Sequence, residues 1–104
     1  MILYANGSKF EGEWRKNKPN GEGIMFFANK DRYEGSWLDG MKSGRGIYYY
    51  DDGSKYEGDW YQDDKDGYGT LVNKNGDKYV GEWRLGSKDG SGIYYYADGG
   101  MYEG

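Results

Sequence analysis

The sequence contains no cysteine and no histidine, and it has a single proline. Without cysteine, neither a disulfide nor a thiolate metal site can stabilise the chain. Without histidine as well, the Ser-His and Cys-His nucleophile systems, the usual zinc sites and the commonest general base are all missing. The composition therefore predicts a protein that is not an enzyme and that uses no cofactor or metal ion.

Aliphatic residues are also few, whereas the 104 residues include 13 tyrosines, 4 tryptophans and 3 phenylalanines. Aromatic rings must therefore supply most of the packing. The 20 glycines oppose long helices, because a glycine inside a helix costs about 1 kcal/mol relative to alanine. We expect one domain, residues 1–104, built from strands joined by turns.

No basic run is present, and 18 acidic against 14 basic residues give a net charge of −4. Nucleic acid is not expected as a partner, since binding it requires a row of cations against the phosphates. The apolar stretch at residues 1–5 is far shorter than a signal-peptide core or a membrane span. The sequence therefore predicts a soluble, cytoplasmic protein.

A repeat of 23 residues runs along the whole chain. Each unit begins with an aromatic residue, continues with a glycine two positions later and a tryptophan four positions later, and ends with a Gly-x-Gly pair and a loop. The units are residues 10–32, 33–55, 56–78 and 79–101, with partial units at 1–9 and 102–104. The recurring residues are Phe10, Tyr33, Tyr56, Tyr79 and Tyr102; Gly12, Gly35, Gly58, Gly81 and Gly104; Trp14, Trp37, Trp60 and Trp83; and the pairs Gly21 and Gly23, Gly44 and Gly46, Gly67 and Gly69, Gly90 and Gly92.

Turn signals come twice in each unit, which predicts two strands per unit. One turn is expected at Asn20-Gly21 and the other at Asp52-Gly53, each with its equivalents in the other units. Short connections pair successive strands antiparallel, so we expect an all-β, elongated, twisted single-layer meander of stacked β-hairpins. With ten strands at roughly 4.8 Å each, the sheet would be about 43 Å long. The expected strands are 10–14, 33–37, 56–60 and 79–83, alternating with 23–27, 46–50, 69–73 and 92–96.

The segment Tyr56-Glu57-Gly58-Asp59-Trp60, followed by Gly67-x-Gly69, resembles the MORN (membrane occupation and recognition nexus) repeat. The resemblance covers nearly the whole chain. Departures from the family pattern are Phe10 in place of Tyr, Val80 in place of Glu, and Asn29-Lys30 in place of the Asn/Asp-Gly turn. The last departure predicts a different loop geometry at residues 28–32.

The resemblance implies that the repeats serve as interaction modules. MORN-containing proteins occur in ciliary radial spokes, in cytoskeletal complexes of protists, in membrane-contact proteins and, as accessory repeats, in some enzymes. From this resemblance we expect a protein of the cytoskeleton or of a cilium, in an assembly such as the axoneme.

The turn geometry also predicts which side chains share a face of the sheet. A two-residue turn at Asp52-Gly53 would place Tyr49 opposite Tyr56 and Ile47 opposite Gly58. The face with these residues would form the core, and the other face would stay uncovered and available to a partner. On that uncovered face the predicted partner-binding residues are Phe27, Tyr48, Tyr50, Tyr94 and Tyr96 for contact area, with Glu34, Glu57 and Asp59 for charge.

These features predict a non-catalytic protein–protein interaction scaffold. Its partner would be a helix or an extended segment with basic residues and apolar anchors. The alternatives are an accessory segment of a larger enzyme and a module that recognises acidic phospholipids. The acidic balance disfavours membrane binding, although Lys9, Arg32, Lys55 and Lys78 form a sparse basic line. Unpaired edge strands also favour end-to-end association or a homo-oligomer.

Three further motifs resemble ligand-binding or catalytic sites but have simpler structural explanations. Residues 21–23 form a Gly-x-Gly pair, but a nucleotide loop needs a third glycine and a following helix. The acidic turn at 63–67 lacks the first and last ligands of a calcium loop. Paired carboxylates such as Glu57 and Asp59 recur on an open sheet without an obvious pocket, so we expect them to solubilise its surface rather than to cleave glycosides.

Overall fold

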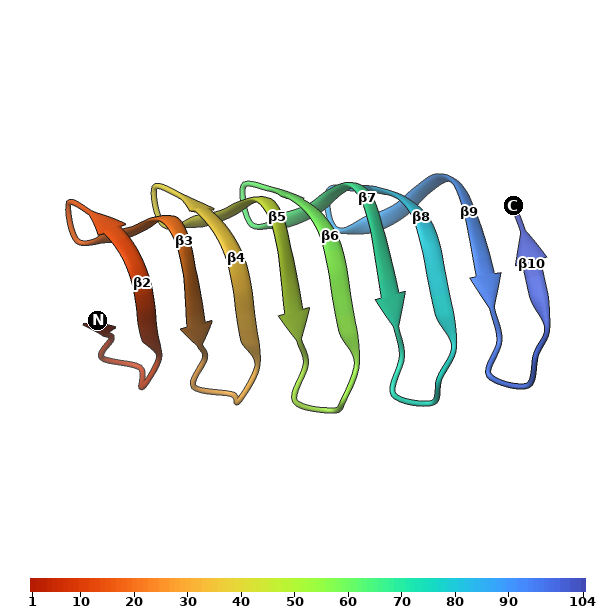
Figure 1. Ribbon diagram of the computed structural model, residues 1–104, viewed down its shortest axis with the longest axis horizontal. Coiled ribbons are helices and arrows are strands. Elements are labelled where there is room, and N and C mark those ends of the chain that lie inside the picture. The colour runs from red at the N-terminus through yellow and green to blue at the C-terminus, as the bar shows by residue number, and fades with distance from the viewer.

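The computed structural model describes residues 1–104 as one antiparallel sheet of ten strands (Figure 1). The strands follow each other in chain order, so the predicted meander is confirmed. Its extents are 46 × 24 × 17 Å, and the chain contains no helix that could cross a bilayer. The strands are β1 (Ile2–Leu3), β2 (Lys9–Arg15), β3 (Lys18–Phe26), β4 (Arg32–Leu38), β5 (Met41–Tyr49), β6 (Lys55–Tyr61), β7 (Asp64–Val72), β8 (Lys78–Arg84), β9 (Ser87–Tyr95) and β10 (Met101–Glu103).

The first hairpin turn of each unit lies earlier than the sequence predicts. We expected it at Asn20-Gly21, but β3 already begins at Lys18. Lys16 and Asn17 form the turn, with φ values of 54° and 63°. Two successive positive φ values characterise a type I′ turn, which matches the twist of the flanking strands. The equivalent turn residues with positive φ are Asp39 and Gly40, Gln62 and Asp63, and Leu85 and Gly86.

The glycine of each predicted turn lies instead in a β-bulge. Gly12 pairs with Gly23 and Trp14 with Pro19, so a single residue of β2 stands opposite three residues of β3. Gly21 is in the middle of these three and has φ 104°, a conformation that favours glycine. The Asn-Gly pair therefore marks a backbone bend within a strand pair, and the prediction of a hairpin end there is wrong.

The second turn of the unit is present at Asp52-Gly53, but its loop is one residue longer than expected. The amide of Tyr50 donates to the carbonyl of Ser54 at 2.9 Å, and the amide of Gly53 donates to the carbonyl of Tyr50 at 3.0 Å. Gly53 has φ 98°. These bonds define a three-residue loop with glycine at its left-handed position rather than a two-residue type I′ turn.

The longer loop changes the register by one residue. Tyr48 lies opposite Tyr56, and Ile47 lies opposite Glu57. Because neighbouring side chains point to opposite faces, this single step moves whole columns across the sheet. Tyr48 shares a face with Tyr56, whereas Ile47 and Tyr49, which we expected in the core, lie on the other face.

The loop at Asn29-Lys30 has the same geometry as the others, contrary to expectation. The amide of Phe27 donates to the carbonyl of Asp31 at 2.9 Å, and the amide of Lys30 donates to the carbonyl of Phe27 at 3.0 Å. Lys30 takes the glycine position with φ 79°. The backbone bonds of the loop therefore outweigh the local preference for glycine.

The core lies on one face and consists almost entirely of rings. Tyr33 packs edge-on against Trp37 of its own unit and against Trp60 of the next, with centroids 5.0 and 5.3 Å apart. The indole nitrogen of Trp60 donates to the carbonyl of Gly46 at 3.2 Å, which ties successive units together. The buried core residues are Phe10, Met25, Tyr33, Trp37, Tyr56, Trp60, Tyr79 and Trp83.

A row of glycines crosses the sheet beneath these rings. Gly58 pairs with Gly46 on one side and with Gly69 on the other, and the pairing continues from strand to strand. A Cβ atom on Gly69 would overlap the hydroxyl and the ring of Tyr56. Each ring therefore lies directly on the backbone, and only glycine leaves room for it. The row consists of Gly12, Gly23, Gly35, Gly46, Gly58, Gly69, Gly81 and Gly92.

Replacing Gly69 by alanine should destabilise the sheet, because the added methyl group displaces the Tyr56 ring. We expect a loss of about 1–3 kcal/mol in the free energy of unfolding, measured by urea denaturation. Gly100→Ala is the control, since its Cβ would approach nothing closer than 3.3 Å. Equal denaturation midpoints for the two variants would contradict the proposed role of the glycine row.

Candidate functional site

The two faces of the sheet differ in composition, and the predicted partner-binding residues are divided between them. We call the face with the core rings the aromatic face and the opposite one the outer face. Phe27, Tyr48, Tyr50 and Tyr94 pack against the core on the aromatic face, and Tyr96 stacks on Tyr94. The carboxylates Glu34, Glu57 and Asp59 lie on the outer face. The prediction that these eight residues form one surface is wrong, because the register differs by one residue from the assumed one.

The aromatic face is concave and holds an open pocket of about 430 Å³. Asp52 and Ser54 line it from the loop at one end of the hairpins, and Gly86 and Lys88 line it from the other end. The strands themselves are curved, as their bent upper ends show in Figure 1. The complete lining is Tyr50, Asp52, Ser54, Lys65, Leu71, Asn73, Trp83, Gly86, Ser87 and Lys88.

Lysines that the sequence analysis overlooked lie on this face. Lys42, Lys65 and Lys88 are one period apart and pair with Trp37, Trp60 and Trp83 on the adjacent strands. Their regular spacing in the sequence could have identified them as a column on one face. We expected a turn close to these positions, however, and not a strand whose side chains alternate between faces.

Aromatic rings surround the ammonium groups of these lysines. The nitrogen of Lys42 lies 5.4–5.8 Å from the ring centroids of Phe27, Tyr33, Tyr48 and Trp60. The nitrogen of Lys65 lies 5.5–5.8 Å from four rings, namely Tyr50, Tyr56, Trp60 and Trp83. Cation–π attraction contributes about 0.5–2 kcal/mol at such sites. The floor of the groove is therefore aromatic and positively charged.

The hydroxyl groups of the core tyrosines are fixed by hydrogen bonds. Tyr56 donates to the carbonyl of Asp59 at 3.0 Å, and Tyr33 donates to that of Ser36 at 3.1 Å. Burial raises the pKa of both phenols well above the usual value. Burial also raises the pKa of Tyr48, and the hydrogen bond that its hydroxyl donates to Asp31 raises it further. These phenols therefore act as neutral donors.

The raised phenol pKa values predict a loss of stability in alkali. The phenols ionise more readily in the unfolded chain than in the folded one. Their contribution to the free energy of unfolding is therefore fully present below about pH 10 and falls as the pH rises further. Urea denaturation should give a constant free energy of unfolding up to that pH and a decline above it.

Tyr56→Phe provides the control for this pH dependence. Phe10 shows that a ring without a hydroxyl fits the equivalent place in the first unit, where it is fully buried. The variant should lose about 0.5–1.5 kcal/mol at neutral pH and should decline less steeply in alkali. An unchanged alkaline slope would contradict the assignment to Tyr56.

On the outer face, three members of the basic line noted in the sequence, Lys9, Arg32 and Lys78, lie over aromatic rings. The guanidinium of Arg32 lies 4.2 Å from the Tyr49 centroid, and the ammonium of Lys78 lies 4.8 Å from that of Tyr95. The guanidinium of Arg32 also lies 3.7 Å from the carboxylate of Glu34, two residues further along β4. Cations and carboxylates are therefore interspersed on this face, and neither sign dominates.

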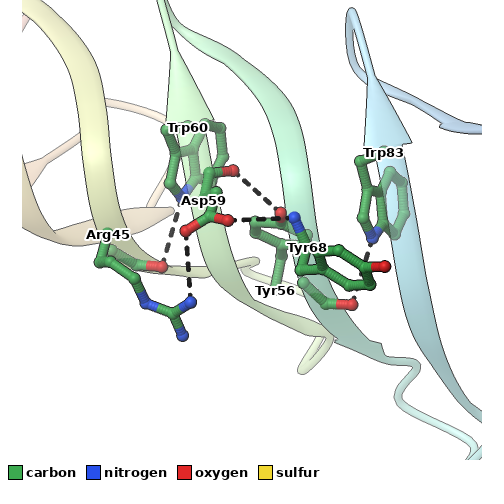
Figure 2. A network of polar contacts seen from close by, with 8 residues as sticks. Arg45, Tyr56, Asp59, Trp60, Tyr68 and Trp83 are labelled. Carbon is green, nitrogen blue, oxygen red and sulfur yellow. Dashed lines mark hydrogen bonds and ion pairs between the residues drawn. The ribbon is translucent and has the colours of Figure 1, made fainter.

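The outer-face carboxylates also hold the bulges in place. Asp59 accepts a hydrogen bond from the amide of Tyr68 at 3.0 Å and one from the guanidinium of Arg45 at 3.2 Å (Figure 2). Glu82 accepts the equivalent amide bond from Ser91 at 2.6 Å. The recurrence of these acids thus has a structural reason. No cluster of three or more His, Cys, Asp or Glu side chains is arranged to hold a metal ion.

Comparison with known protein families agrees with this architecture. A model of the MORN repeat family matches four consecutive stretches, residues 10–32, 33–55, 56–78 and 79–101. The chain belongs to the MORN repeat family. Repeats of this family are generally protein- or membrane-interaction modules and are usually non-catalytic. A search of curated proteins finds no match.

Proposed function

We propose that the chain is a non-catalytic scaffold that binds a protein partner in the concave groove of the aromatic face. The observation that carries this proposal is the row of half-buried rings with no second layer above them. Phe27, Tyr48, Tyr50 and Tyr94 pack against the core from one side only. Tyrosine supplies large contact area at low entropic cost, which suits a surface that alternates between water and a partner.

The shape of the groove fits an elongated partner segment. The sheet is 46 Å long, and the residues that line the pocket come from three successive units. A helix or an extended strand could contact equivalent rings in successive units, as in helix-in-groove and strand-addition recognition. The short edge strands β1 and β10 provide a second type of binding site, because an edge strand can pair with a strand of another protein or of a second copy of this chain.

The proposed setting is a cytoskeletal or ciliary assembly in the cytoplasm. Its support is the kind of assembly in which MORN-containing proteins occur. A module of a larger enzyme would present the same groove, and its repeats would then bring a partner to that enzyme.

Binding to an acidic membrane surface is the second candidate function. The outer-face cations Lys9, Arg32, Lys55 and Lys78 favour it, since they lie in one row. The neighbouring carboxylates oppose it, because they repel anionic headgroups. Co-sedimentation with phosphatidylserine vesicles at low and physiological salt separates the candidates. Salt-sensitive pelleting that requires the outer-face cations would favour the membrane.

The scaffold proposal predicts that partner capture depends on Tyr50. In a pull-down from a ciliated or cytoskeletal extract, Tyr50→Ser should lose specific proteins that the wild-type chain retains, because the ring lies in the groove. Tyr68→Ser is the matched control, since this tyrosine is 62% exposed on the outer face. Circular dichroism should confirm that both variants are folded. Loss of the same proteins from the Tyr68 variant alone would place the contact on the outer face.

A further inference from the structure

The third unit, residues 56–78, differs from its neighbours on the aromatic face. Tyr48 and Tyr50 recur as Tyr94 and Tyr96 two periods later. Between them, the equivalent residues are Leu71 and Asn73, which are smaller. Both line the 430 Å³ pocket. The groove is therefore filled by its own rings in the units on either side and is hollow in this one.

Lys65, which lies beside this hollow, lacks the ion pair found one unit earlier. Lys42 lies 3.4 Å from the carboxylate of Asp63. The amide of Asp63 donates to the carbonyl of Lys42, and that of Gly86 donates in the same way to Lys65, both at 3.0 Å. The backbone is thus equivalent at the two sites, but Gly86 has no carboxylate to offer Lys65.

No carboxylate of the chain forms an ion pair with Lys65. The ion pairs of the structure are Arg32–Glu34, Lys42–Asp63 and Arg45–Asp59. The ammonium group of Lys65 lies against aromatic rings, where a carboxylate gains more Coulomb energy than in open water.

The rest of the lining supplies neutral donors and one acid. Asn73, Ser54 and Ser87 contribute an amide and two hydroxyl groups. Asp52 is the only acidic residue in the lining, and the amide of Ser54 donates to its carboxylate at 2.8 Å. Two lysines against one aspartate leave the pocket with a net positive charge. Trp83, Tyr50 and Leu71 form its apolar walls.

We infer that this pocket binds an acidic side chain of a partner peptide, with an apolar residue beside it. The carboxylate would lie between Lys65 and Lys88, and the apolar side chain would rest on Trp83. This inference rests on the proposed scaffold function and specifies its partner. The inferred partner is acidic, whereas the sequence predicted a basic one. The carboxylates that led to that prediction lie on the outer face.

The geometry favours a peptide over a membrane at this site. The pocket lies in a concave groove between two rows of hairpin ends, and Lys65 is partly buried at its floor. A flat bilayer would meet the hairpin ends before it reached the ammonium group of Lys65. A peptide chain can enter such a groove, and its volume is within the roughly 300–1,000 Å³ range of ligand sites.

The inference can be tested by selecting random displayed peptides against the folded chain. Selected peptides should be enriched in Asp or Glu next to an apolar residue, and their affinity should fall as salt is added. A Lys65→Gln, Lys88→Gln double variant should bind them about tenfold or more weakly. The matched control carries Lys55→Gln and Lys78→Gln on the outer face and should bind as the wild type does.

A second double variant tests the pocket without changing its charge, and it is designed to keep the fold. Leu71→Tyr with Asn73→Tyr introduces the residues that the neighbouring units already carry at these positions, so the fold should be retained. The added rings should fill the pocket and weaken binding of the selected peptides by a similar factor. Peptides rich in Lys or Arg, or binding that neither double variant weakens, would overturn the inference.

The same selection distinguishes the inference from the scaffold proposal. If the selected peptides lack acids but require Tyr50, the groove binds proteins and only the acidic specificity is refuted. If no selected peptide requires Tyr50, both proposals fail. Phosphatidylserine vesicles that pellet the wild-type chain but not the Lys65 and Lys88 variant would overturn the inference in favour of a membrane.

Discussion

The structure depends on one contact, an aromatic ring lying on a pair of glycines. A tyrosine hydroxyl such as that of Tyr56 reaches the carbonyl of Asp59 only because its ring passes over Gly58 and Gly69 without hindrance. The same ring then contacts the tryptophans of two successive units. This one contact thus determines the packing, the hydrogen bonding and the connection between units. It also explains how a single layer of sheet can have a buried core.

Because this contact repeats, each unit depends mainly on its neighbours, as in other linear repeat proteins. The ring, glycine and tryptophan positions are constrained, while positions such as 71 and 73 are not. The groove can therefore change its shape and charge in one unit without altering the frame. The hollow beside Lys65 illustrates this freedom, since the backbone around it matches that of the filled units.

The period of the sequence was enough to predict the number of strands, their order and the approximate length of the sheet, because identical units must stack in the same way. The faces could not be predicted from it. A glycine after Asn or Asp suits a turn and a bulge equally well, so Gly21 was misassigned. One additional residue in the loop at Asp52-Gly53 then exchanged the faces of Ile47 and Tyr48. The groove lysines were missed for the same reason, since the expected strands began after them.

The direction of the strands has a mechanical consequence. The two termini lie at opposite ends of the long axis, and the strands run across it (Figure 1). Tension applied between the termini would act on one hairpin at a time, so its hydrogen bonds would break in sequence rather than together. A ribbon of this kind would yield in steps of one hairpin, and each step would be reversed when that hairpin closes again.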